Sequence, residues 1–190
     1  MKKLISTLGL LYTVISAQSF AESGYTLDPK LSNITFATIK KQFVVEPASI
    51  KPMSGGLTEE GQFSIVLDLK TVSTGVAIRD QRLNELYFES MNFPEVKISG
   101  KVEPSMLSGE PKRATIAAEV TLHGVTKTID FPVVVVPSSG FVMVSSASTI
   151  IVNGADFGIS TENLNKLSAT VGGLAISDKI PLSFNLLFDQ

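Results

Sequence analysis

Hydrophobic and polar residues alternate along most of the chain, with the period of two that is typical of half-buried β-strands. The alternation is clearest in 62–69, where Ile65 and Leu67 lie on one face and Ser64 and Asp68 lie on the other. The same reasoning predicts strands at Tyr25–Leu27, Ser32–Ile39, Phe43–Ser54, Glu95–Val102, Arg113–Leu122, Thr126–Val136, Phe141–Val152 and Ile180–Phe188, and a short helix at Glu162–Leu167. About eight strands separated by turn signals predict an all-β fold, either an antiparallel barrel or a sandwich.

Prolines and a glycine mark irregular points in these strands. Pro47 and Pro52 lie within Phe43–Ser54. Because proline cannot donate a hydrogen bond to a neighbouring strand, we expect an edge or bulged strand there. His123 and Gly124 stand between two strands, and they predict a tight hairpin turn.

One stretch, Val72–Pro94, has the spacing of a helix instead. Leu83, Leu86 and Tyr87 fall at positions i, i+3 and i+4, and they therefore share one helical face. Asp80 stands just before them, where its side chain can accept a backbone N–H of the first turn. Two phenylalanines and a proline end the segment. We predict that this helix covers the open end of a β-barrel.

The N-terminal segment has the composition of a secretory signal peptide. Two lysines are followed by an apolar run over Leu4–Ile15 and by Ser19-Phe20-Ala21, which resembles a cleavage site. A membrane anchor is the alternative, but a spanning helix needs about 20 apolar residues, and this run is shorter. We therefore predict a signal peptide at 1–21 and a single domain at 22–190.

Composition narrows the cellular location and the class of partner. The chain has no cysteine, which for an exported protein favours the periplasm of a Gram-negative bacterium over a disulfide-rich eukaryotic domain. Removal of Lys2 and Lys3 changes the formal charge from −2 to −4. A mildly acidic chain without a basic cluster is not expected to bind nucleic acid or an anionic membrane surface. Because Trp is absent and only three Tyr are present, we do not expect an integral outer-membrane barrel, which carries aromatic girdles.

The residue types that catalysis needs are scarce. His123 is the only histidine, and neither a Ser-His-Asp triad nor a zinc site has recognisable partners for it. A histidine beside Gly124 in a hairpin is better explained as a structural turn residue. We therefore predict no catalytic residues, no metal site and no cofactor, and we do not expect an enzyme.

Several short motifs occur in a fixed order across nearly the whole predicted domain. They are Tyr25-Thr26-Leu27-Asp28-Pro29, Ser73-Thr74-Gly75 with Arg79-Asp80, Phe93-Pro94, the run VTLHGVTK at 120–127, and Asp156-Phe157-Gly158. In this order they resemble the YceI family of periplasmic, lipocalin-like, polyisoprenoid-binding proteins. The resemblance implies an eight-stranded antiparallel barrel, closed at one end, with a helix over the mouth. It also implies an elongated apolar interior that binds a long isoprenoid or a related amphiphilic lipid.

Three positions depart from the usual pattern of that family. Leu31 and Arg82 stand where members often have histidine, and Val45-Glu46-Pro47-Ala48 stands in place of a Gly-x-Phe motif. The first hairpin is therefore altered. We expect this change to affect the choice of ligand more than the fold.

The apolar strand faces fit either a packed core or a cavity, because an eight-stranded barrel can be filled by side chains or can hold one ligand. Long strands, a mixture of small and large inward residues, and the predicted lid favour a cavity, and the resemblance implies one. The predicted lipid-binding residues of the interior and lid are Phe36, Ile65, Leu67, Leu83, Leu86, Tyr87, Ile98, Ala118, Val120, Phe131, Val133 and Phe184.

Arg79 and Arg82 are candidate contacts for a polar or diphosphate head group at the mouth, since a guanidinium group matches phosphate geometry. The alternative is structural, with Asp80 capping the helix and Arg79 paired with a nearby carboxylate or carbonyl. Both alternatives remain open from the sequence.

Taken together, these features predict a soluble periplasmic binding protein that carries or stores a lipid. An isoprenoid, quinone-like or fatty amphiphile is the expected ligand and the only predicted partner. The alternatives are an enzyme acting on a lipid, and a non-catalytic structural or stress-related envelope protein with a filled barrel. The sequence leaves the oligomeric state open, a dimer included.

Overall fold

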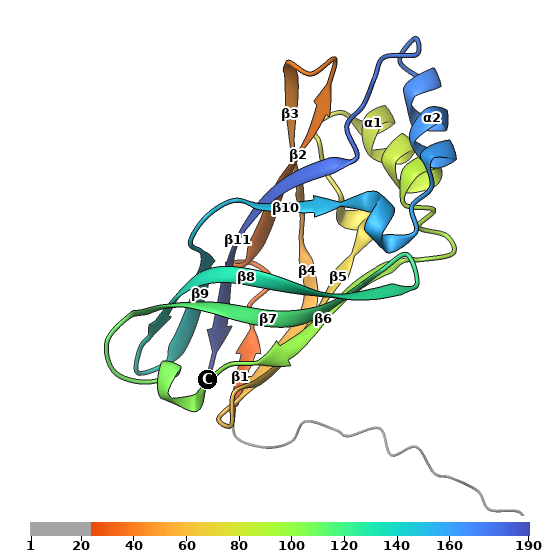
Figure 1. Ribbon diagram of the computed structural model, residues 1–190. Helices are drawn as coiled ribbons and strands as arrows, with labels where there is room; N and C mark the ends of the chain where they lie inside the picture. The colour runs from red at the N-terminus through yellow and green to blue at the C-terminus, as the bar shows by residue number, and fades with distance from the viewer. Residues whose placement is uncertain (1–23) are drawn as a thin grey trace, which may run out of the picture.

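Residues 24–190, which the structure describes, form a closed antiparallel β-barrel with two short α-helices at one end (Figure 1). The structure is a computed structural model, and the predicted signal peptide lies outside the described residues. The predicted all-β barrel with a helical cover is confirmed. Its strands are β1 Gly24–Leu27, β2 Asn33–Lys40, β3 Val44–Ile50, β4 Pro52–Thr58, β5 Gln62–Asp68, β6 Glu95–Lys101, β7 Lys112–Leu122, β8 Val125–Pro137, β9 Phe141–Ser146, β10 Ile150–Asn153 and β11 Lys179–Asp189.

The eleven strands of the described chain occupy eight positions around the barrel. The ring runs through β1, β4, β5, β6, β7, β8, β9 and β11, and it closes where β11 pairs with β1. Strands β1 and β2 follow one another along one edge of β11, and β9 and β10 follow one another along its other edge. Strand β4 pairs with β1, and β3 pairs in the same way with β2, so β3 and β4 share the next position. Three positions are thus shared by two strands each, and the expected number of eight applies to the ring.

Two segments that we predicted as single strands are divided. Phe43–Ser54 splits into β3 and β4, with an irregular register between Pro52 and Ser54, as its prolines indicated. The prediction of one continuous strand over Phe141–Val152 is wrong, because the segment splits into β9 and β10. The first part ends at Ser146, whose Oγ accepts a hydrogen bond from the Phe184 N–H at 3.1 Å. A side chain therefore takes the place of a ladder partner at this point.

The two α-helices lie side by side at the end of the barrel opposite the C-terminus (Figure 1). None of the helices within 24–190 is long and apolar enough to cross a bilayer. The prediction that Asp80 caps the first helix is wrong, because Val76 is the N-cap residue. The Asp80 carboxylate instead accepts hydrogen bonds from the N–H and the hydroxyl of Thr74, at 2.7 and 2.5 Å. The helical segments of the described chain are helix α1 Ala77–Arg82, a π-helical turn Leu83–Tyr87, helix α2 Thr161–Ala169, and 3-10 helices Leu69–Thr71, Pro104–Met106 and Gly154–Phe157.

The predicted hairpin turn between β7 and β8 is confirmed. Leu122 pairs with Val125, and the two residues between them, His123 and Gly124, have φ angles of 51° and 76°. Positive φ at both central residues is the geometry that suits the twist of two-residue hairpins. In this turn, His123 contacts Glu89 of the lid segment, as we call residues 72–94.

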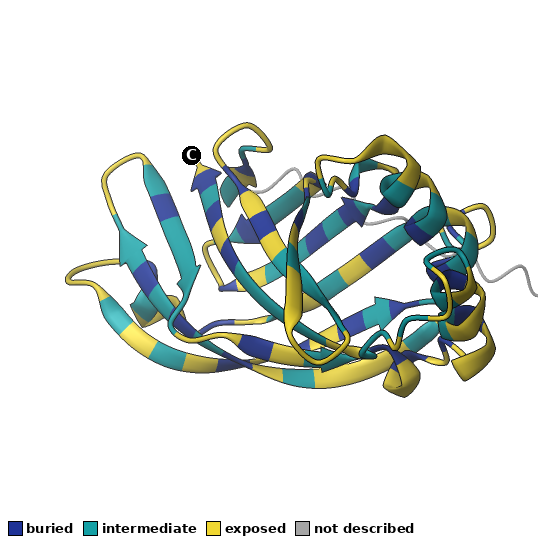
Figure 2. Cartoon of the chain, turned by 90° about the horizontal axis from the view of Figure 1, so that it is seen from above, coloured by how far each residue is buried: buried dark blue, intermediate teal, exposed yellow. Residues whose placement is uncertain are grey.

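Buried and exposed residues alternate along the strands (Figure 2). In β7, Ile116, Ala118 and Val120 are buried, whereas Ala117 and Glu119 are exposed. Successive side chains of a strand point to opposite faces, so the buried set faces the barrel axis. The interior is consequently the most hydrophobic region of the molecule.

Candidate functional site

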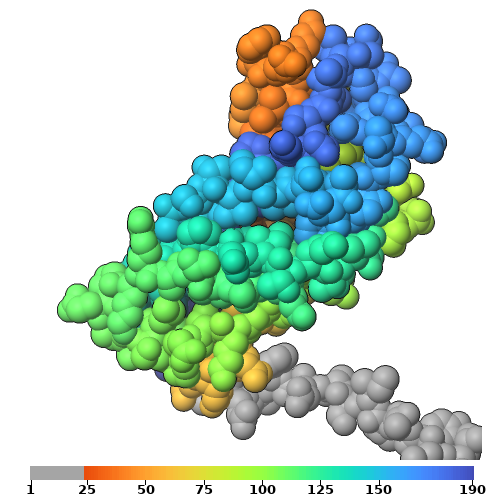
Figure 3. Space-filling model, in the orientation of Figure 1, coloured from red at the N-terminus to blue at the C-terminus, as the bar shows by residue number. Residues whose placement is uncertain are grey.

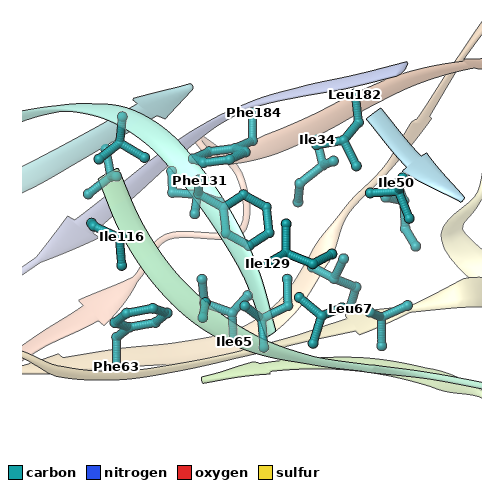
Figure 4. A pocket seen from close by; sticks show the side chains of 18 of the residues that line it. Ile34, Ile50, Phe63, Ile65, Leu67, Ile116, Ile129, Phe131, Leu182 and Phe184 are labelled. Carbon is teal, nitrogen blue, oxygen red and sulfur yellow. The ribbon is translucent and has the colours of Figure 1, made fainter. Parts of the chain in front are cut away.

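The inward side chains leave a cavity along the barrel axis. Its volume is about 180 Å³, and every residue that lines it in the described part of the chain is hydrophobic. Figure 4 shows Ile65, Phe131 and Phe184 approaching it from different strands. An engineered cavity of roughly 150 Å³ lined by Leu, Ile and Phe stays dry and binds benzene or xenon. By the same physics, this interior disfavours water and accepts an apolar guest.

Contacts among the large side chains hold them against the cavity wall. The rings of Phe131 and Phe184 meet edge to face, with centroids 5.9 Å apart, an arrangement that aromatic pairs prefer. Phe63 lies over Gly100 of the neighbouring strand, where a Cβ atom would come within 2.7 Å of the ring. The missing side chain of Gly100 therefore makes room for the ring of Phe63.

Nine of the twelve predicted interior residues line this cavity. Their role in lipid binding stays a prediction, but the structure places them around one space. They belong to strands β2, β5, β6, β7, β8 and β11, and they are Phe36, Ile65, Leu67, Ile98, Ala118, Val120, Phe131, Val133 and Phe184.

The three residues predicted for the lid, Leu83, Leu86 and Tyr87, do not line the cavity. The π-helical turn explains this, because the N–H of Phe88 bonds to the carbonyl of Leu83 at 2.9 Å, five residues back. A wider turn rotates the predicted face away from the barrel axis, and this segment packs against α2. Phe88, directly after the π-helical turn, lines the cavity, and an assumption of regular α-helical periodicity could not identify it.

A polar network attaches the lid segment to the barrel. Asn163 of α2 is buried, and its Nδ2 donates to the Tyr87 carbonyl at 3.1 Å and to the Glu89 carboxylate at 2.9 Å. His123 places its Nε2 2.9 Å from the same Glu89 oxygen, and its ring centroid lies 4.0 Å from that of Phe93. Glu89 therefore joins the end of the lid to both α2 and the β7–β8 turn.

The surroundings of two groups in this region shift their pKa values. Hydrogen bonds, first from Asn163 and then from His123, lower the pKa of Glu89 below its usual value of 4.5. Burial raises the pKa of Tyr87 to about 12, and the nearby Asp178 carboxylate adds to the effect. Glu89 is therefore charged, and Tyr87 neutral, near neutral pH.

We expect the contribution of Glu89 to stability to disappear in acid. Because folding lowers its pKa, the carboxylate favours the folded state above pH 4.5, and this contribution is lost as the pH falls through the lowered folded-state value. Glu89→Gln should therefore lower Tm at pH 7, and the difference from the unmodified protein should shrink toward pH 3. Glu60→Gln, at an exposed turn position, is the control in the same thermal melts. A Tm difference that stays constant with pH would contradict the prediction.

Arg79 and Arg82 do not line the apolar cavity. An Nη atom of Arg79 lies 3.0 Å from the carboxylate of Glu46 on β3, which is the local pairing that the structural alternative predicted. Nη1 of Arg82 donates to the carbonyl of Thr170 at 3.3 Å. Both arginines line a second hollow beside the lid.

No group of three or more His, Asp and Glu side chains within 24–190 is arranged to hold a metal ion. His123 has one acidic neighbour, Glu89, and an aromatic one, Phe93. The strongest feature of the site is therefore its apolar volume.

Comparisons with known proteins agree with this geometry. The family model described as a YceI-like domain matches residues 25–188. The chain is similar to the structure of a polyisoprenoid binding domain from Saccharophagus degradans implicated in plant cell wall breakdown, with 26% identity, a TM-score of 0.81, and coverage of 87% of this chain and 97% of that chain. It shares the fold of BcnA from Burkholderia cenocepacia, with 13% identity, a TM-score of 0.58, and coverage of 85% and 98%. A comparison with curated proteins gives no match.

Proposed function

Because the chain belongs to the YceI-like family, we propose that it is a periplasmic binding protein that holds the tail of an isoprenoid or related amphiphile in its barrel. In this proposal the protein carries or stores the lipid and catalyses no reaction. The observation that supports it most directly is the cavity, whose described lining carries no polar side chain. The similar domain from Saccharophagus degradans is described as polyisoprenoid binding.

The energetics of hydrocarbon transfer support the same proposal. Each buried CH₂ group gains roughly 0.8 kcal/mol relative to water. A tail of several isoprene units therefore has a strong tendency to leave water. The barrel interior provides that environment without requiring any polar group of the wall to lose a partner.

We expect protein purified without detergent from its native host to contain about one amphiphile per chain. Denaturing extraction followed by quantitative mass spectrometry measures the amount and identity of the lipid. A second periplasmic protein of similar size, purified in parallel, controls for lipid that adheres nonspecifically. Trace amounts of the same mixed lipids in both samples would contradict the proposal.

A further inference from the structure

A second hollow, also about 180 Å³, lies beside the lid, between strand β2, helix α1 and the region of α2. Figure 3 shows the β2–β3 hairpin and the α2 region side by side at this end of the molecule. Hydrophobic residues form part of its wall. The rest of the wall is polar, and among the described residues it consists of Thr38, Lys40, Arg79, Arg82 and Thr170.

This hollow and the apolar cavity are lined by consecutive parts of strand β2. Ile34 and Phe36 line the cavity, and Thr38 and Lys40, the next two residues on the same face of the strand, line the hollow. At about 3.3 Å per residue, Phe36 and Lys40 lie roughly 13 Å apart along the strand. The inner face of β2 thus changes from apolar to cationic as it leaves the barrel. An amphiphilic molecule has the same sequence of properties along its length.

The hollow has more positive than negative charge. Lys40, Arg79 and Arg82 line it, whereas no carboxylate of the described chain does. Glu46 is not a lining residue, and its carboxylate is shared between the Lys40 ammonium at 2.5 Å and the Arg79 guanidinium at 3.0 Å. Arg82 has no ion pair among the described residues, and its hydrogen bond to the Thr170 carbonyl leaves most of its donors free.

A hydroxyl group adds to the unused donors. The Oγ1 of Thr38 is buried and has no hydrogen-bond partner in the described structure. Asp80, the acidic residue of α1, accepts hydrogen bonds from the N–H and hydroxyl of Thr74 on the preceding loop. A buried hydroxyl without a partner is costly, so an acceptor placed in this hollow would satisfy it.

We propose that this hollow binds the anionic head group, a phosphate or carboxylate, of the amphiphile whose tail lies in the barrel. Arg82 and Lys40 supply charge and donors to the anion, and Thr38 donates a hydrogen bond. Guanidinium groups bind carboxylate and phosphate with two parallel hydrogen bonds, which gives geometric selection as well as attraction. The inference rests on the proposed function, and it assigns the class of lipid.

The test compares three ligands by isothermal titration calorimetry on protein stripped of lipid. Farnesyl phosphate and farnesol share one tail and differ in the head group, and inorganic phosphate lacks the tail. We expect farnesyl phosphate to bind at least about tenfold more tightly than farnesol, as charge-assisted hydrogen bonds allow. Lys40→Gln combined with Arg82→Gln should reduce this ratio to less than about threefold while farnesol affinity stays within about twofold. Lys41→Gln, an exposed neighbour outside the hollow, should leave both affinities unchanged.

The other outcomes separate the two proposals. Equal affinities for farnesol and farnesyl phosphate in the unmodified protein would overturn the head-group assignment and leave tail binding intact. The head-group assignment would also be overturned if the double variant kept its preference for farnesyl phosphate over farnesol. The same holds if inorganic phosphate binds as tightly as farnesyl phosphate. Failure of both farnesyl compounds to bind would instead overturn the proposed function. Thermal melts of each variant, and Arg82→Gln alone as a milder change, establish that the proteins compared are folded.

Discussion

Replacing Ala118 by Phe should weaken farnesol binding by at least about a hundredfold, which corresponds to roughly 3 kcal/mol. Ala118 is 2% exposed, lies on β7 and lines the cavity. A phenyl ring built on this position projects into the space that the tail would occupy, so ligand and side chain compete for one volume. Overpacking typically costs about 1–3 kcal/mol, but here the new ring enters a hollow, and we expect the fold to survive.

Ala117→Phe is the matched control for this change. Ala117 is the adjacent residue of the same strand and is exposed on the outer face. The Ala117→Phe variant should bind farnesol with an affinity within about twofold of the unmodified protein, because an isolated exposed apolar side chain is tolerated on a surface. Ala118→Leu, which adds less volume, should give an intermediate affinity. If Ala118→Phe is folded by circular dichroism yet binds farnesol normally, the tail does not lie in this cavity.

The largest effect on stability is expected for Gly61→Ala, which should lower the free energy of unfolding by at least about 3 kcal/mol. Gly61 ends the turn between β4 and β5 with a φ of +84°, and a Cβ atom there would lie 2.0 Å from the carbonyl oxygen of Val102. The Val102 N–H donates to the Gly61 carbonyl at 2.9 Å. The alanine therefore strains its own backbone and also separates two strands that are joined at this point.

Gly109→Ala separates the backbone strain from the clash with Val102 as causes of the expected loss of stability. Gly109 has a similar φ of +79°, but no atom lies within 4 Å of the position of its missing Cβ. This variant should lose only the backbone part, about 1 kcal/mol. Urea unfolding followed by circular dichroism measures both losses. Equal losses in the two variants would show that the contact with Val102 is not the cause.

Most of the barrel wall could be predicted because strand periodicity needs only the identity of the strand and of its face. Ile65 and Leu67 on β5, and Ala118 and Val120 on β7, were placed in the interior by this rule, and they line the cavity. The number of strand positions was also predictable. The sharing of three positions between shorter strands was not, because it depends on which residues β11 pairs with on each of its edges.

The lid and the second hollow depend on information that a local pattern does not contain. The hydrogen bond from Phe88 back to Leu83 widens one helical turn, and this turned the predicted lid residues toward α2. Lys40, Arg79 and Arg82 come from segments far apart in the sequence, so the chain showed no basic cluster. They meet only because the β2–β3 hairpin and α1 lie together. A local departure from α-helical geometry determined the lid, and packing between distant segments determined the hollow.

The position of β11 has a consequence for how the protein folds. This last strand pairs with four others, and through Ser32 and Leu187 it joins residues 155 positions apart. Contacts between such distant residues form slowly because a long loop must first be closed. A nascent polypeptide that lacks β11 cannot complete the ring, whatever the stability of its earlier hairpins. The barrel therefore closes only after β11 has been synthesised.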